Sequence, residues 1–239
     1  MKLVLFIFCS LLGFSTMAQE KAMLEDPNVK PRAIKGSFNA IEVSDGITLY
    51  LSAGKEESVA VGFSDSKYED RFKTEVKDGI LRIYYDNKGI GWTGKERRNL
   101  RAYVSFKTLE KLEASGGASV KIPVGISVGN LVMKFSSGSS FDGRVAATDI
   151  AIEQSSGSHI NLTGKADRVS VEAGSGAHFR GFDFSAELGS ARASSGAKIS
   201  FTIEKELSAR ASSGAQVRYK GAAMLKDINV SSGGTVKKA

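Results

Sequence analysis

The sequence predicts an all-β protein built mainly as a right-handed parallel β-helix, a solenoid whose rungs stack on one another. Three observations predict it: a Ser-Gly phrase recurs seven times, apolar and polar residues alternate on both sides of each copy, and no copy contains a run long enough for a helix. Successive copies are 18 to 21 residues apart. A unit this short cannot bury its apolar face alone, so neighbouring units must stack. The final glycines of the copies are Gly117, Gly138, Gly157, Gly176, Gly196, Gly214 and Gly233.

The residues around each of these glycines follow the same pattern of apolar and polar positions. Three positions after the glycine the residue is apolar, and two and four positions after it the residue is small or polar. Five positions before the glycine the residue is apolar, and four positions before it the residue is nearly always charged. Alternation with a period of two predicts a strand on each side of a Ser-Gly corner, where glycine tolerates the sharp bend. It also excludes a flexible Gly/Ser-rich linker. One internal stack is expected from Val120, Phe141, Ile160, Phe179, Ile199, Val217 and Val236.

Residues 1–18 have the pattern of a secretion signal, with Lys2 before an apolar stretch and small residues before Gln19. The stretch is too short to span a bilayer, and it contains the only cysteine, Cys9. The mature chain is therefore expected to have neither a disulfide nor a transmembrane segment. We expect export by the general secretory route, to the periplasm, the outer cell surface or the medium.

The mature chain is expected to begin with a polar leader over 19–33 and to continue as a single domain over 34–239. Within that domain, alternating strands interrupted by a loop at 86–99 occupy 34–106, and the regular rungs occupy 107–239. The strand at 101–106 is expected to resume the strand pattern after the loop and to lead into the first regular rung.

The charge of the chain narrows the choice of partners. The formal net charge is +7, and removing residues 1–18 removes Lys2 and no acid, which leaves +6. Basic charge suits anionic glycans, lipid headgroups or nucleic acid. An exported protein does not meet nucleic acid in the ordinary course, so no nucleic-acid partner is expected. The charges are interspersed, which is typical of a solvated surface.

The loop at 86–99 is the longest departure from the strand pattern. It contains Gly89-Ile90-Gly91-Trp92-Thr93-Gly94, which matches the dinucleotide-binding pattern G-x-G-x-x-G. Such a site needs a helix directly after the glycines, and the residues that follow read as a strand. We therefore predict no bound cofactor.

The same loop supplies the candidate ligand-binding residues, which are Trp92, Lys95, Arg97 and Arg98. Tryptophan stacks on the apolar faces of sugars, and arginine pairs with carboxylate or phosphate, so together they suit an anionic glycan. The alternative is that Trp92 covers the end of the core while the basic residues keep the loop soluble.

Two pairs of polar residues invite a chemical interpretation. His159 and His178 occupy the same column in consecutive rungs, but the column offers no third strong ligand, so no metal site is predicted. Glu153 and Glu172 are adjacent in another column, where paired carboxylates could cleave a polysaccharide. Lys134 and Arg192 flank that pair and can neutralise it, so no catalytic residue is predicted.

The phrase at 38–44, the Asp45-Gly46 turn, the segment at 76–81 and the Ser-Gly repeats resemble a bacterial family described as putative auto-transporter adhesin, head GIN domain. The resemblance covers about 34–239. It implies an exported β-helical domain with an adhesive role, and it supplies no catalytic residues.

Together these observations predict an exported, non-catalytic, adhesin-like binding domain of the bacterial cell envelope that recognises glycans. Two alternatives stay open: a polysaccharide lyase or hydrolase on the same fold, and a purely structural envelope protein. Fold alone does not separate them, because function depends on sites placed on folds.

Overall fold

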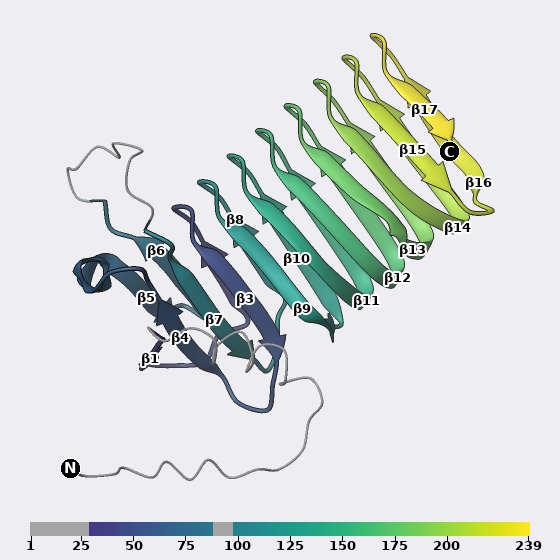
Figure 1. Cartoon of the computed structure of the whole chain (residues 1–239). Helices are drawn as coiled ribbons and strands as arrows, with labels where there is room; N and C mark the ends of the chain where they lie inside the picture. The colour runs from purple at the N-terminus through teal and green to yellow at the C-terminus, as the bar shows by residue number, and fades with distance from the viewer. Residues whose placement is uncertain (1–28, 88–97) are drawn as a thin grey trace, which may run out of the picture.

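The computed structural model describes residues 29–87 and 98–239, and it is a β-solenoid of about seven rungs that follows a section of N-terminal strands (Figure 1). The predicted all-β class is confirmed. The predicted signal, 1–18, lies outside the described residues. No helix among the described residues is long and apolar enough to cross a membrane. The elements are β1 Lys30–Arg32, β2 Ala40–Val43, β3 Thr48–Ala53, β4 Ser58–Gly62, the 3₁₀ helix η1 Ser66–Arg71, β5 Phe72–Lys77, β6 Ile80–Tyr85, β7 Arg101–Phe106, β8 Lys111–Ala114, β9 Ser119–Ser127, β10 Asn130–Phe135, β11 Ser140–Gln154, β12 His159–Ala173, β13 His178–Ala193, β14 Lys198–Ala211, β15 Gln216–Lys220, β16 Met224–Val230 and β17 Thr235–Lys238.

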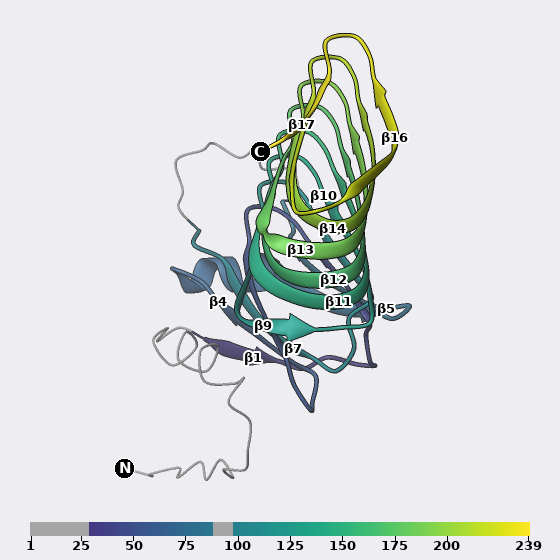
Figure 2. The same ribbon diagram turned by 90° about the vertical axis from the view of Figure 1, so that its right-hand side faces the viewer.

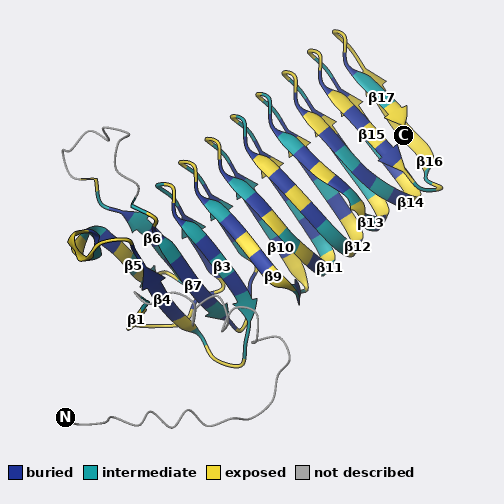
Figure 3. Ribbon diagram, in the orientation of Figure 1, coloured by how far each residue is buried: buried dark blue, intermediate teal, exposed yellow. Residues whose placement is uncertain are grey.

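Strands of consecutive regular rungs pair in parallel, in the register that the sequence columns predict. Phe141 on β11 lies level with Val120 on β9 and with Ile160 on β12. The same column continues through β13, β14 and β15 to Val236 on β17. All its members are buried except Val236, which lies on the last rung and is half-buried. The predicted internal stack is confirmed, and buried and more exposed residues alternate along most strands of the regular rungs, whereas β16 in the last rung is exposed throughout (Figure 3).

Each Ser-Gly corner is a type I′ turn, in which both central residues have positive φ. At the corner formed by 155–158, φ is 51° at Ser156 and 69° at Gly157. The amide of Ser158 closes this turn by donating to the carbonyl oxygen of Ser155 at 3.0 Å. Positive φ at the glycine agrees with the sequence interpretation. The left-handed serine before it was not foreseen, because serine has no special freedom in that region.

The corners are joined by a ladder of hydrogen bonds along the solenoid. The amide of Gly157 donates to the carbonyl oxygen of Ser175 in the next rung at 3.1 Å, and Gly176 donates likewise to Ser195 at 3.0 Å. Equivalent bonds begin at Gly46, Gly117, Gly138, Gly196 and Gly214. This corner ladder fixes the register of the rungs at their narrow end, which stands uppermost in Figure 2.

The N-terminal strands contribute two further rungs, whose stacking order differs from their order in the chain. β2 and β3 flank a corner at Asp45-Gly46 and pair with β8 and β9 of the first regular rung. On their other side, β2 pairs with β6 and β3 pairs with β7. Along the chain, β7 leads into β8 of the first regular rung, as the sequence predicts, but in space the rung of β2 and β3 lies between them.

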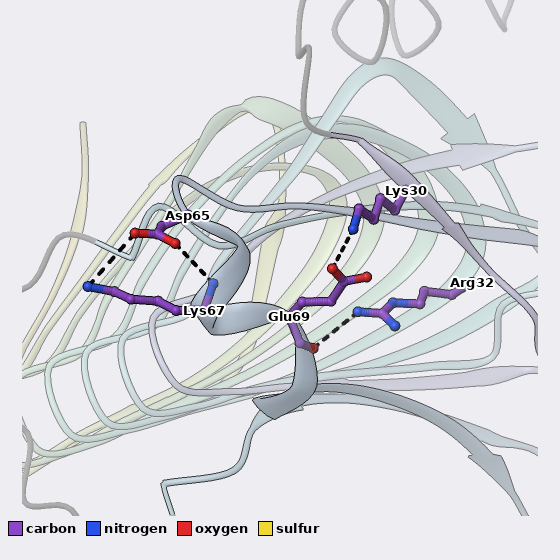
Figure 4. Close-up of polar contacts among 5 residues, drawn as sticks. All are labelled: Lys30, Arg32, Asp65, Lys67 and Glu69. Atoms are coloured by element: carbon purple, nitrogen blue, oxygen red, sulfur yellow. Dashed lines mark hydrogen bonds and ion pairs between the residues drawn. The ribbon is translucent and has the colours of Figure 1, made fainter.

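Antiparallel strands close the N-terminal end of the stack. β5 pairs with β6, β4 pairs with β7, and β1 adds to β4. Lys30 and Arg32 of β1 hold η1 in place: Lys30 forms an ion pair with Glu69, and Arg32 Nη2 donates to the Glu69 carbonyl oxygen at 3.2 Å (Figure 4). Asp65 caps η1, because its Oδ1 accepts from the amide of Lys67 at 3.0 Å. The last residues of the predicted polar leader thus belong to the sheet.

The C-terminal end of the stack carries no such cover among the described residues. β16 leaves Met224, Leu225, Ile228 and Val230 exposed. On β17, Lys238 lies level with Tyr219, whose column points inward. A charge at an inward position discourages the addition of a further strand.

Replacing Gly157 by alanine tests the corner geometry without a steric complication. A methyl group at this position meets nothing within 4 Å, so only the backbone strain at φ 69° changes. We expect the free energy of unfolding to fall by about 1–2 kcal/mol in urea titrations. The control is Ser156→Gly, which relieves strain at φ 51° and should leave stability unchanged or raised. An unchanged stability for Gly157→Ala would contradict this geometry.

Candidate functional site

A groove of about 1000 Å³ runs along one side of the corners and crosses most of the rungs. Its walls come from the charged column four positions before each glycine and from the corner residues that follow it. Parallel stacking places equivalent residues about 4.8 Å apart, so the groove repeats the same chemistry at each step. The charged lining residues are Glu42, Asp45, Arg82, Glu113, Lys134, Glu153, Glu172, Arg192 and Arg210, and the hydroxyl-bearing ones include Ser44, Ser115, Ser136, Ser155, Ser194 and Ser212.

The charged column of the groove is neutralised by ion pairs. Three pairs form within the column: Arg82 Nε with Glu42 Oε2 at 3.1 Å, Lys134 Nζ with Glu153 Oε2 at 2.9 Å, and Arg192 Nη1 with Glu172 Oε1 at 3.3 Å. Glu113 and Arg210 pair with Lys111 and Asp227 outside it. The ion pair with Glu153 raises the pKa of Lys134 above its ordinary value, mainly through the hydrogen bond and then through the opposite charge.

The two adjacent carboxylates stand in equivalent surroundings. Glu153 lies level with Glu172 in the register of β11 and β12, as the sequence predicts. Each side chain is 54% exposed, and each is ion-paired to a cation of a neighbouring rung. Hydrolysis of a glycosidic bond needs one protonated and one ionised carboxyl group. Two carboxyl groups hold these different protonation states only when their surroundings differ. This pair lacks that difference.

Of the loop residues singled out from the sequence, only Arg98 is described; Trp92, Lys95 and Arg97 lie outside the described residues. The guanidinium of Arg98 sits 4.2 Å from the centre of the Tyr85 ring, and its Nη1 donates to Asn87 Oδ1 at 3.0 Å. Tyr85 is buried, so Arg98 covers an aromatic residue at the base of the loop.

Two further residues at the loop base were not found from the sequence. Asp45 Oδ1 accepts from Asn87 Nδ2 and Asp45 Oδ2 accepts from the Tyr85 amide, each at 3.3 Å. Arg71 Nε donates to the Asp86 carbonyl oxygen at 2.6 Å. The Asp45-Gly46 turn was visible in the sequence, but Arg71 is the last residue of η1, where no repeat marks it. Because Asp45 also lines the groove, the loop begins at the groove's N-terminal end.

The two histidines lie side by side, as the shared column predicts, with ring centres 5.2 Å apart. The described residues contain no group of three His, Cys, Asp or Glu side chains that could hold a metal ion. Partial burial lowers the pKa of His178, and the charges of His159, Lys198 and Arg180 lower it further. The surface around this pair is therefore positive.

The fold and the groove define a parallel β-solenoid with a long, hydroxyl-lined surface. The chain belongs to the family described as putative auto-transporter adhesin, head GIN domain, whose model matches residues 37–223. The resemblance found in the sequence is thereby confirmed.

Solved structures share this fold at low sequence identity. A putative adhesin from Bacteroides fragilis has a TM-score of 0.79 and 17% identity, over 88% of this chain and 96% of its own. A putative adhesin from Parabacteroides distasonis has a TM-score of 0.68 and 18% identity, over 90% and 98%. A putative lipid binding protein from the same species has a TM-score of 0.66 and 20% identity, over 89% and 97%. No curated protein matches the sequence. None of these descriptions names a chemical reaction.

The effect of the surrounding positive charges on the pKa of His178 can be measured by NMR titration. We expect its pKa below the ordinary 6.5, and Lys198→Gln should raise it because one of the charges that lowers it is removed. A histidine with a depressed pKa binds fewer protons in the folded than in the unfolded chain. Its contribution to stability is therefore present above pH 6.5 and is lost as the pH falls through the folded pKa. A pKa of His178 at or above 6.5 would contradict the assignment.

Proposed function

We propose that this chain is an exported, non-catalytic binding domain of the adhesin type that recognises glycans at the bacterial cell envelope. The observation that carries the proposal is the groove, whose rigid walls present hydroxyl groups and neutralised ion pairs at regular steps. Protein sites for sugars combine such polar groups with a preformed concave surface. The family description is consistent with an adhesive role.

The loop at 86–99 is proposed as the end of this site. Its described base adjoins the groove through Asp45 and Asn87. Loops on rigid scaffolds commonly carry binding residues, and Trp92 would supply an aromatic ring for stacking on a sugar. In this proposal Lys95, Arg97 and Arg98 would contact negative groups of the glycan.

The alternative of a polysaccharide lyase or hydrolase is less well supported. Glu153 and Glu172 are equally exposed and each is ion-paired to a cation, so nothing distinguishes an acid from a base. A purely structural envelope protein would need neither the groove nor the loop to bind anything. Binding measurements separate it from the proposed function.

A glycan array probed with the mature chain tests the proposal, with product formation assayed in parallel. We expect binding without turnover. Trp92→Ala should weaken the binding and leave the melting temperature unchanged. If Trp92 instead covers the core, the same change should lower the melting temperature by several degrees, because burying a large aromatic side chain contributes a few kcal/mol. Turnover, or the absence of any glycan binding, would overturn the proposal.

A further inference from the structure

The sheet face on the other side of the corners carries positive charge without a balancing acid. Its outward positions in the last four rungs hold five exposed cations, and no carboxylate occupies an outward position between the corner and the end of this patch. Asp183, the next acid along the chain, lies in the bulge where β13 leaves the face. We call this patch the basic face; its cations are Arg180, Lys198, Arg218, Lys220 and Lys237.

These cations differ from those of the groove in their partners. Each groove cation is ion-paired to a carboxylate within 3.3 Å. Among the described residues, none of the five cations of the basic face forms an ion pair with a carboxylate. The two sides of the same corners therefore have opposite characters, one neutralised and one open to an anion.

The register arranges the cations in lines along the solenoid. Arg180, Ser200, Arg218 and Lys237 follow one another in a single column, and Lys198 lies in the adjacent column between His178 and Gln216. With a step of about 4.8 Å, the first column spans about 14 Å. Lys121 and Arg144 extend the charge toward the N-terminal rungs, where Asp142 is the one carboxylate at an equivalent position among the described residues.

An aromatic ring lies among these charges. Phe182 is half-buried on the same face, with Lys220 Nζ 4.6 Å and Arg218 Cζ 5.9 Å from its ring centre. Ser200 and Thr202 add hydroxyl groups between the cations, held by bonds to the carbonyl oxygens of Phe179 and Phe182. A ring, hydroxyl groups and cations at regular spacing form a surface suited to a charged sugar chain.

We propose that the basic face binds a linear acidic polysaccharide laid along the solenoid axis. This inference goes beyond the proposed function, because it assigns a second surface and does not depend on the groove. The cations lie one or two rungs apart on a straight, rigid sheet, so they can face the negative groups that a linear acidic chain carries at regular intervals.

An anionic membrane fits this face less well. Peripheral proteins that lie on membranes insert apolar side chains below the headgroups. The exposed apolar residues of β16, including Met224 and Leu225, lie on the open end of the stack and not among these cations. Phe182 is a single half-buried ring flanked by the cations Lys220 and Arg218, and one such ring does not form an apolar patch that could insert into a membrane.

Binding of the purified mature chain to polygalacturonate, measured by isothermal titration calorimetry at low and physiological salt, tests the inference. We expect binding that weakens with salt, because exposed charges are screened. The triple variant Lys198→Gln, Arg218→Gln, Lys220→Gln should bind about tenfold more weakly, since each exposed ion pair with the polymer contributes modestly and three of them are lost together. The matched control is Lys55→Gln, Lys73→Gln, Lys77→Gln, which removes the same charge from exposed lysines elsewhere and should change the affinity less than about twofold.

Each other outcome overturns the inference. Equal losses in the two triple variants would mean that net charge alone attracts the polymer. Equal binding to fully methyl-esterified polygalacturonate would mean that the acid groups are not recognised. Binding to phosphatidylglycerol vesicles that the basic-face variant loses, with no binding to the polysaccharide, would assign the face to a membrane. The proposed function fails separately, through the glycan array and Trp92→Ala.

Discussion

The hydrogen bond from each corner glycine to the next rung is the interaction on which the rest of the structure depends. The corner turns the chain through two residues of positive φ, which leaves the glycine amide pointing along the solenoid. That amide meets the carbonyl oxygen of the left-handed residue above it, as Gly157 meets Ser175. Because the pairs lie in line, a one-residue slip of any rung would break the corner bond and move apolar side chains to the outside.

Because the register is fixed, residues at equivalent positions of the repeat lie in line on the same face of the solenoid. On one side of the corners, charges of both signs occur in one column and pair between neighbouring rungs, as Lys134 does with Glu153. On the other side, cations such as Arg180 and Arg218 recur without a carboxylate partner among the residues that the structure describes. The solenoid needs neither arrangement for stability, since exposed ion pairs contribute little and unpaired cations repel. We therefore explain the contrast between the two faces by the different ligands that we propose for them.

Much of the fold followed from the sequence, because one short unit is repeated and each copy supports the interpretation of the others. The internal stack from Val120 to Val236 and the neighbouring positions of His159 and His178 were predictable for that reason. The N-terminal stacking order was not, because nothing local places β3 between β7 and β9. Arg71 and Asp45 each bond to residues at the loop base, and only this long-range arrangement brings them there. The basic face could have been found by counting charges column by column, and not merely polar residues.

Native-state hydrogen exchange at the corner glycines tests the corner ladder most directly. The amides of Gly138, Gly157, Gly176, Gly196 and Gly214 each donate to the next rung, and they should exchange as slowly as the amides of the central strands. The amide of Gly233 lies on the last described rung, where no next corner accepts from it, and it should exchange rapidly. Rapid exchange at all six glycines, with protected strands on either side, would contradict the account.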